Sequence, residues 1–276
     1  FTGVGAKNPS NNQYQYFAGG GGGGGRNDAG AGGLGGGGTG GGGSPVATNG
    51  LFGTGGGGGG VGEPHNAPHQ AAGGSGIVVV RYKIASASTA KATGGAISFY
   101  GGKTIHTFTY SGEFERTDAS LSSIELIVVA GGGSGARSYG GGGGGAGGFR
   151  ESHSTDVSGP YTASPLATPT GITLTAQTYP ITVGAGGGDE PNGGTSGADT
   201  TFTSPVPTPF GTSIIGEGGG GAGGFPNGSA NQGGSAGGEG WEGDSTQDFK
   251  TATQSMHAPF CPETVSMMPI VRPAIK

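Results

Sequence analysis

Cysteine and charged side chains are both scarce in this chain. The single cysteine, Cys261, excludes a framework of intrachain disulfides. Charged residues make up 11% of the chain, and the net charge of −5 is spread out without a basic cluster, so we expect no nucleic-acid partner. No apolar run reaches the length of a membrane span, and no charged-then-apolar stretch indicates a signal segment, so we expect no membrane insertion. A chain that begins at Phe1 predicts a processed product or an excerpt of a longer protein.

Glycine is abundant instead. The chain has 73 glycines among its 276 residues, whereas an average protein has about 7% glycine. Such a composition is typical of a flexible linker or of an ordered glycine assembly. Ordering costs about 1–2 kcal/mol per residue and is most costly for glycine, so ordered glycine needs main-chain partners. We predict the ordered form, because backbones without Cβ atoms come close enough for N–H···O and Cα–H···O bonds.

Short aliphatic strands lead directly into the glycine runs. Residues 124–130 precede a run that begins at Gly131, and in the opposite sense residues 73–76 lead into residues 77–82. The glycine run at 19–25 would span about 22 Å as polyproline II, at ~3.1 Å per residue. Residues 124–130 would span about 24 Å as a strand. The matching lengths predict an all-β fold, with short strands or a β-sandwich combined with a bundle of glycine-rich polyproline II segments.

The periodicity also predicts a division of the chain into parts. Strands are expected at residues 77–84, 104–110, 113–117, 123–130, 177–183, 198–204 and 212–215. Pro205, Pro207 and Pro209 predict a corner. We expect a closing part of a glycine-rich unit at 1–84, a linker at 85–97, an opening part at 98–245 and an extended tail at 246–276.

A series of short motifs carries a family resemblance. They read IELIVVAGGG from Ile124, GGGGAGGFR from Gly142, YPITVGAGG from Tyr179, SGADTTF from Ser196 and GSGIVVVRY from Gly74. Together they resemble the glycine-rich domain of bacteriophage virion and tail-fibre proteins. A weaker likeness is to the tip adhesins of T-even-type phages, in which polyproline II glycine helices pack as a sandwich and loops touch the host receptor. The resemblance implies a self-assembling structural subunit of an extracellular fibre or virion.

The order of these motifs is unusual, because the closing strand precedes the opening hairpin. Residues 1–83 of one chain could complete the unit begun by residues 98–243 of a neighbour, which would give a head-to-tail polymer. The alternatives are closure within one chain, or an excerpt from a longer repeat protein. The residues that we expect to serve assembly are Ile77, Val78, Val79, Val80, Tyr82, Ile124, Leu126 and Val128.

Aromatic residues at the ends and gaps of the glycine runs suggest a second function. They either cap the bundle and shield its main-chain bonds, or contact a receptor or a glycan on the host surface. A phage adhesin that binds through loops at 151–178 and 225–245 is therefore an alternative to the fibre subunit, and a non-viral cell-surface filament is a third. The candidate receptor contacts are Tyr139, Tyr161, Phe225 and Trp241.

The sequence offers little that indicates an enzyme. Residues 131–136 fit a dinucleotide-binding pattern, but the glycines that follow cannot form the helix which that site needs. Residues 233–237 fit the nucleophile elbow, a match expected by chance in so much glycine. We expect no catalytic residues, no cofactor and no metal. Two polar clusters carry side chains of the metal-ligating type: Glu63, His65 and His69, and Asp189, Glu190 and Asp199.

Overall fold

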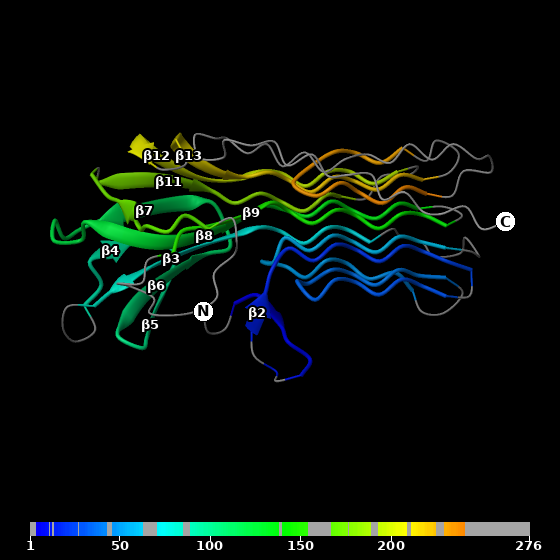
Figure 1. Cartoon of the computed structure of the whole chain (residues 1–276), viewed down its shortest axis with the longest axis horizontal. Helices are drawn as coiled ribbons and strands as arrows, with labels where there is room; N and C mark the ends of the chain where they lie inside the picture. The colour runs from blue at the N-terminus through cyan, green and yellow to red at the C-terminus, as the bar shows by residue number, and fades with distance from the viewer. Residues whose placement is uncertain are drawn as a thin grey trace.

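A computed structural model describes residues 4–10, 12, 14–26, 28–42, 46–62, 71–84, 89–137, 140–153, 167–175, 177–188, 193–208, 211–224 and 229–240. Two antiparallel β-sheets stack at one end of the molecule, and glycine segments run from them side by side along its long axis (Figure 1). The regular elements of the described residues are all β-strands, which confirms the predicted all-β fold.

The first sheet is built around β3 and β8. Its strand order is β10-β8-β3-β6-β5, and β9 also pairs with β8. On β3, Val80 lies between His106 of β6 and Leu126 of β8. All these pairings are antiparallel. The strands are β3 (Ile77–Lys83), β5 (Ala96–Tyr100), β6 (Lys103–Phe108), β8 (Ser123–Val129), β9 (Phe149–Glu151) and β10 (Ile172–Thr173).

The second sheet has the order β13-β12-β11-β7-β4. Its central strand, β11, pairs with β7 on one side and with β12 on the other. The strands are β4 (Ala92–Thr93), β7 (Gly112–Arg116), β11 (Thr178–Thr182), β12 (Thr200–Thr208) and β13 (Gly211–Gly216). A separate pair, β1 (Ala6–Lys7) and β2 (Tyr14–Tyr16), forms a small two-stranded sheet.

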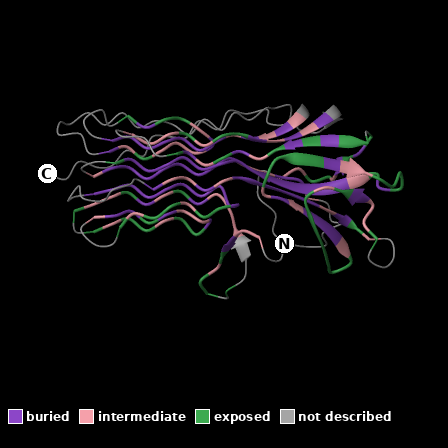
Figure 2. Cartoon of the chain, turned by 180° about the vertical axis from the view of Figure 1, so that it is seen from behind, coloured by how far each residue is buried: buried purple, intermediate pink, exposed green. Residues whose placement is uncertain are grey.

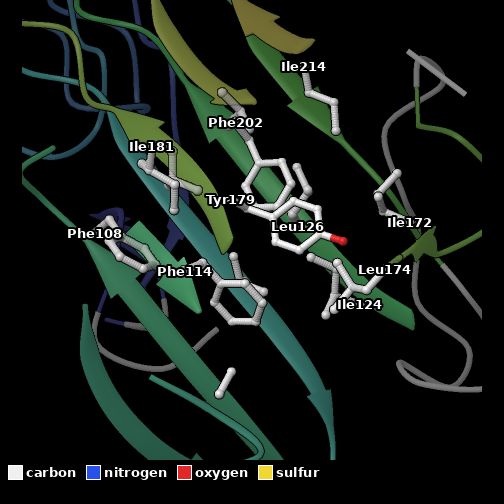
Figure 3. Packing of buried hydrophobic residues seen from close by; sticks show 14 of the residues in the cluster. Phe108, Phe114, Ile124, Leu126, Ile172, Leu174, Tyr179, Ile181, Phe202 and Ile214 are labelled. Atoms are coloured by element: carbon white, nitrogen blue, oxygen red, sulfur yellow. The ribbon is translucent and has the colours of Figure 1, made fainter. Parts of the chain in front are cut away.

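One apolar cluster fills the space between the two sheets. A file of rings crosses it from Tyr82 and His106 on the first sheet through Phe114 and Tyr179 to Phe202 on the second. Neighbouring ring centroids in this file are 5.2 to 6.3 Å apart. Figure 3 shows the three phenyl and phenol rings of the second sheet among the aliphatic side chains of β8 and β13. At such distances ring pairs add about 0.5–1.5 kcal/mol beyond the burial of their area.

The outer face of the first sheet is buried as well, so β3 and β8 have apolar side chains on both faces. This explains why both strands read as continuous aliphatic runs instead of alternating ones. The N-terminal segment and β9 supply the cover. The cluster on this face contains Ile77, Val79, Ile105, Ile127 and Val129, with Val4, Phe17, Ala18 and Phe149 packed against it.

Seven strands predicted from periodicity are confirmed as β3, β6, β7, β8, β11, β12 and β13. The predicted corner at the prolines is wrong, because β12 passes through Pro205 and Pro207. The register of β12 against β13 shifts between Thr203 and Thr208, as expected where proline cannot donate to the ladder. Pro209 lies outside the described residues.

The predicted linker at 85–97 is shorter than expected, because β4 and the first residues of β5 lie within it. Gly94 and Gly95 both have positive φ and form the bend between these two strands. β4 pairs with β7, whereas β5 pairs with β6, so the two strands belong to different sheets. The predicted tail at 246–276 lies outside the described residues.

Both edges of β3 are hydrogen-bonded within the same chain, to β6 and to β8. The reversed motif order allowed either donation to a neighbouring chain or closure within one chain, and the structure has closure within one chain. The donation of residues 1–83 to a neighbouring chain is not observed, because no free edge of β3 remains. The parts at 1–84 and 98–245 contribute together to the sandwich and to the glycine bundle (Figure 1).

Candidate functional site: the glycine bundle

The glycine segments continue the strands of the sandwich and keep the same neighbours. β3 and β8 pair through Ile77 and Val129. Beyond that point Gly132 N–H donates to the Gly74 carbonyl, and Gly135 N–H to that of Ala71. The pairs β8–β9, β11–β12 and β12–β13 continue in the same way, so the sandwich sets the order of the segments in the bundle. The continuing bonds run from Ala130 to Gly148, from Ala198 to Ala185 and from Gly197 to Gly219.

Hydrogen bonds between these segments recur at every third residue. A β-strand repeats every two residues, whereas the polyproline II helix has three residues per turn. The observed period therefore differs from that of a β ladder and equals the number of residues in one polyproline II turn. In one parallel pair, the N–H groups of Gly19, Gly22 and Gly25 donate to Gly35, Gly38 and Gly41. In one antiparallel pair, Gly141, Gly144 and Gly147 donate to Val61, Gly58 and Gly55.

Segments that extend different sheets bond to each other directly. In the sandwich, side chains hold the two sheets about 10 Å apart. In the bundle, Gly76 N–H, just before β3, donates to the Gly184 carbonyl, just after β11. Likewise Gly131 N–H donates to the Ala198 carbonyl. The two layers come into main-chain contact because there are few side chains to separate them.

Three parallel segments at residues 19–25, 35–41 and 57–60 form a closed ring of donors and acceptors. The first donates to the second, the second to the third, and the third back to the first. Collagen also packs three extended chains with glycine at the crowded axis. To close the ring, the N–H groups of Gly38 and Gly41 donate to the carbonyls of Gly57 and Gly60, respectively. The N–H groups of Gly57 and Gly60 donate in turn to the carbonyls of Gly19 and Gly22.

The packing in the bundle leaves no room for side chains at its inner positions. A Cβ added at Gly58 would collide with the carbonyl oxygen of Ala71. Its neighbours Gly57, Gly59 and Gly60 would each meet a different main-chain carbonyl. These inner segments are buried along the length of the bundle (Figure 2). Main-chain hydrogen bonds and close contacts between main-chain atoms therefore hold the bundle together.

A few polar side chains tie the segments together. Asp199 accepts a hydrogen bond from Gly218 N–H at 2.8 Å, and Ser134 Oγ accepts one from Thr195 N–H at 2.9 Å. The hydroxyl oxygens of Thr39 and Thr48 lie 3.0 Å apart across two neighbouring segments. Asp199 is one of the metal-ligand candidates from the sequence, and in the structure its carboxylate accepts from a glycine amide at the start of a segment.

A buried ion pair lies on the outer face of the first sheet. Arg81 of β3 and Glu125 of β8 are directly paired residues, and Arg81 Nε donates to Glu125 Oε2 at 2.7 Å. Their side chains are 11% and 1% exposed. His153 Nδ1 lies 3.9 Å from Glu125 Oε1. A carboxylate this deeply buried needs its partner, since an uncompensated buried charge is strongly destabilising.

A second polar network lies inside the sandwich. His106 Nδ1 is 2.7 Å from the Gly94 carbonyl, which can only accept, so this nitrogen carries a proton. His106 Nε2 lies 3.1 Å from the Tyr82 hydroxyl, which in turn accepts from Lys91 N–H. Burial lowers the pKa of His106 below 6.5 and raises the pKa of Tyr82 above 10.0. Both groups are therefore neutral near pH 7, with Tyr82 donating to His106 Nε2.

Large apolar side chains are exposed at two places on the sandwich and its junction with the bundle. On β5, Ile97, Phe99 and Tyr100 are 41%, 45% and 64% exposed. At the junction, the rings of Phe52 and Tyr110 lie 5.9 Å apart. Their exposed fractions are 55% and 75%. Sequence reasoning did not single out these residues, although the apolar stretch at 96–100 between glycine pairs was a usable signal for β5.

The predicted site residues fall into two groups. The expected assembly residues Ile77, Val78, Val79, Val80, Tyr82, Ile124, Leu126 and Val128 are all buried in the two apolar clusters. They stabilise the fold, and their side chains are not available to a second copy. The expected receptor contacts Tyr139, Tyr161, Phe225 and Trp241 lie outside the described residues, as do Glu63, His65, His69, Asp189 and Glu190.

The part of the chain that the structure describes groups no three His, Cys, Asp or Glu side chains in the manner of a metal site. Within that same part, no helix combines the length and the hydropathy of a membrane span.

Comparison with known proteins places this architecture in a family. A family model described as a glycine-rich domain matches residues 107–257, which is more than half of the chain. Neither the curated proteins nor the solved structures yield a match. The matched range begins in β6 and includes β7 to β13 with their glycine segments. On the strength of that match and of a bundle built from glycine main chain, the chain belongs to the family of glycine-rich domain proteins.

Proposed function

We propose that this protein is a non-enzymatic structural subunit of an extracellular fibre or phage virion that associates with further copies of itself. The observation that carries the proposal is the glycine bundle, in which main-chain hydrogen bonds join extended segments in several directions. The motifs that resemble virion and tail-fibre proteins lie on the strands and segments that build this bundle.

The physics of the bundle suits a mechanical role. Each inner glycine is held by hydrogen bonds and by carbonyl groups at contact distance. Bending the bundle would stretch many such bonds at once, and each buried bond left unmade costs about 1–3 kcal/mol. A catalytic site, by contrast, needs a nucleophile, a base and an orienting group that converge. The polar groups of the bundle instead serve its main chain, as Asp199 does for Gly218.

Electron microscopy of the purified full chain over a range of concentrations tests the proposal. We expect elongated particles that join into longer fibres or regular clusters as the concentration rises, and light scattering that follows the same dependence. Immunogold labelling of particles from the source would then place the chain on a fibre or a virion. A chain that stays a monomer at every concentration, and that labels no particle, would contradict the proposal.

A receptor-binding adhesin is the second candidate, and the exposed aromatic pair of Phe52 and Tyr110 favours it. Aromatic side chains are enriched at recognition surfaces, and this pair is more than half exposed. The adhesin would bind a host-surface receptor or glycan through such residues and the loops at 151–178 and 225–245.

Binding of labelled protein to host cells and to a glycan array tests this second candidate. We expect Phe52→Ala and Tyr110→Ala to reduce binding while leaving the melting temperature unchanged. Equal binding by both variants and the unchanged protein would count against a role of this pair in recognition. Binding without any fibre formation would favour the adhesin over the fibre subunit.

A further inference from the structure

β5 is an edge strand with an open side. It pairs with β6 alone, and the described residues place no strand beyond it. All five of its residues are exposed, including Ile97, Phe99 and Tyr100. An edge strand presents a row of main-chain donors and acceptors to any strand that can reach it. β5 therefore presents three large, exposed apolar side chains at an open sheet edge.

The usual features that protect an edge strand are missing from β5. Proteins block such edges with lysine, proline, bulges or very short strands. The stretch 96–100 holds no charge and no proline. Its register against β6 runs without a shift from Ala96 to Tyr100. Gly95 and Gly101, both with positive φ, delimit the strand at its two ends.

The side chains of β5 also lie where a neighbouring strand would complete their contacts. Directly paired residues of two strands point to the same face, so Ile97 lies on the core side with His106, and Phe99 with Thr104. The second sheet ends at β4, which has only two residues. Ile97 and Phe99 consequently remain 41% and 45% exposed although they lie on the core-facing side.

We propose that β5 is a self-association edge, which pairs antiparallel with β5 of a second copy about a two-fold axis at Ser98. This arrangement sets Ile97 opposite the partner copy's Phe99 and Ala96 opposite its Tyr100. Pairs of β-branched and aromatic residues contribute about 0.2–1 kcal/mol each across strands. The stretch is thus complementary to itself, and no like charges meet. The inference rests on the proposed self-assembly and names one of its contacts.

The exposed area indicates how strong the contact is. An aromatic side chain buries about 150–250 Å², so the exposed parts of three large side chains amount to roughly 300 Å² per copy. A stable interface buries about 800 Å² per partner. Pairing through β5 alone is therefore weak and dependent on concentration. A two-fold contact also closes on itself, so a fibre would need a second contact as well.

Disulfide trapping in the full chain detects such a weak contact. Ser98→Cys would be made in a Cys261→Ser background, which removes the only native thiol. Directly opposed residues have Cα atoms about 4.5–5.5 Å apart, within the range that a disulfide spans. The matched control is Tyr110→Cys in the same background, a position that is 75% exposed but lies off β5.

We expect Ser98→Cys to form covalent dimers about tenfold faster than Tyr110→Cys, because pairing raises the local thiol concentration. Ile97→Cys and Phe99→Cys should cross-link with each other when mixed, and more slowly when each is alone. Equal cross-linking of Ser98→Cys and Tyr110→Cys would overturn the inference. If fibres form without that preference, the contact lies elsewhere and the proposed function stands. If no association occurs at all, the result contradicts both the β5 contact and the proposed self-assembly.

Discussion

The glycine run at residues 19–25 provides a direct test of close main-chain packing. A Cβ at Gly21 would collide with the Gly58 carbonyl, whereas a Cβ at Gly20 would meet only the Gly144 carbonyl oxygen, at 4.0 Å. The substitutions Gly21→Ala and Gly20→Ala add the same methyl group to neighbouring residues of one run. Any difference between them reports the surroundings, because the change in composition is identical.

The expected magnitude follows from the bonds that must move. In Gly21→Ala the Gly58 carbonyl has to retreat, yet it accepts Gly144 N–H at 2.8 Å. Gly21 N–H also donates to the Gly144 carbonyl at 2.9 Å. Losing both bonds lowers the free energy of unfolding by roughly 2–6 kcal/mol, at about 1–3 kcal/mol for each bond left unmade. Gly20→Ala should raise it by about 0.4–1 kcal/mol, since alanine restricts the unfolded chain.

Urea unfolding followed by circular dichroism measures both values, and thermal melts provide a second readout. At about 2–4 °C per kcal/mol, Gly21→Ala should lower the melting temperature by roughly 4–24 °C. The three-residue period predicts that Gly23→Ala is tolerated like Gly20→Ala, whereas Gly22→Ala is not, since its Cβ would meet the Gly30 carbonyl. Equal stability of the four variants would refute the argument that main chain packs against main chain here.

Three further predictions concern the sandwich. Arg81→Met should lower the free energy of unfolding by about 3–5 kcal/mol, because the carboxylate of Glu125 stays buried after its charge partner is removed. Adding Glu125→Leu to the same chain should restore much of that loss. Urea unfolding of the single and double variants tests both expectations. Because burial lowers the pKa of His106, the unfolded state binds more protons below pH 6.5. Stability should therefore fall as the pH drops from 6.5 toward the lowered pKa, and the unfolding free energy of His106→Gln should depend less on pH over that window. Tyr179→Phe removes the hydroxyl that accepts Thr175 N–H at 2.8 Å, so we expect a loss of about 1 kcal/mol in urea unfolding, and no change would show that water replaces the bond.

The strands that could be predicted are those whose own side chains require burial. Residues 77–83 and 123–129 are rich in β-branched and aliphatic residues, and both form central strands of the first sheet. The sequence did not predict β4 and β5, because their own side chains do not require burial. β4 has only two residues, and it exists because β7 offers it a ladder. β5 is exposed throughout, so its hydrophobic pattern reflects no core of its own.

The expected assembly residues show where sequence reasoning on the candidate site reaches its limit. The aliphatic pattern of residues 77–82 indicates that these side chains are covered, but not by what. The second sheet covers Val78 and Val80, while the N-terminal segment packs against the cluster that contains Ile77 and Val79. The same pattern would suit a strand donated to a neighbouring chain. Only the pairing of β3 with both β6 and β8 shows that the strand is buried within its own chain.

Composition by itself limited the chain to a flexible linker or an assembly packed through its main chain, because 73 glycines offer hydrogen-bond donors and acceptors but no side chains to interlock. So much glycine also disfavoured helices, and the short aliphatic runs beside the glycine segments indicated the all-β fold. Only the tertiary structure decided which glycines are indispensable. Gly20 and Gly21 are neighbours in one glycine run, yet a Cβ at Gly20 would lie 4.0 Å from the nearest carbonyl oxygen, whereas a Cβ at Gly21 would collide with one. The difference arises because Gly58, which is distant in the chain, lies beside Gly21. Such long-range neighbours are set by the tertiary structure alone.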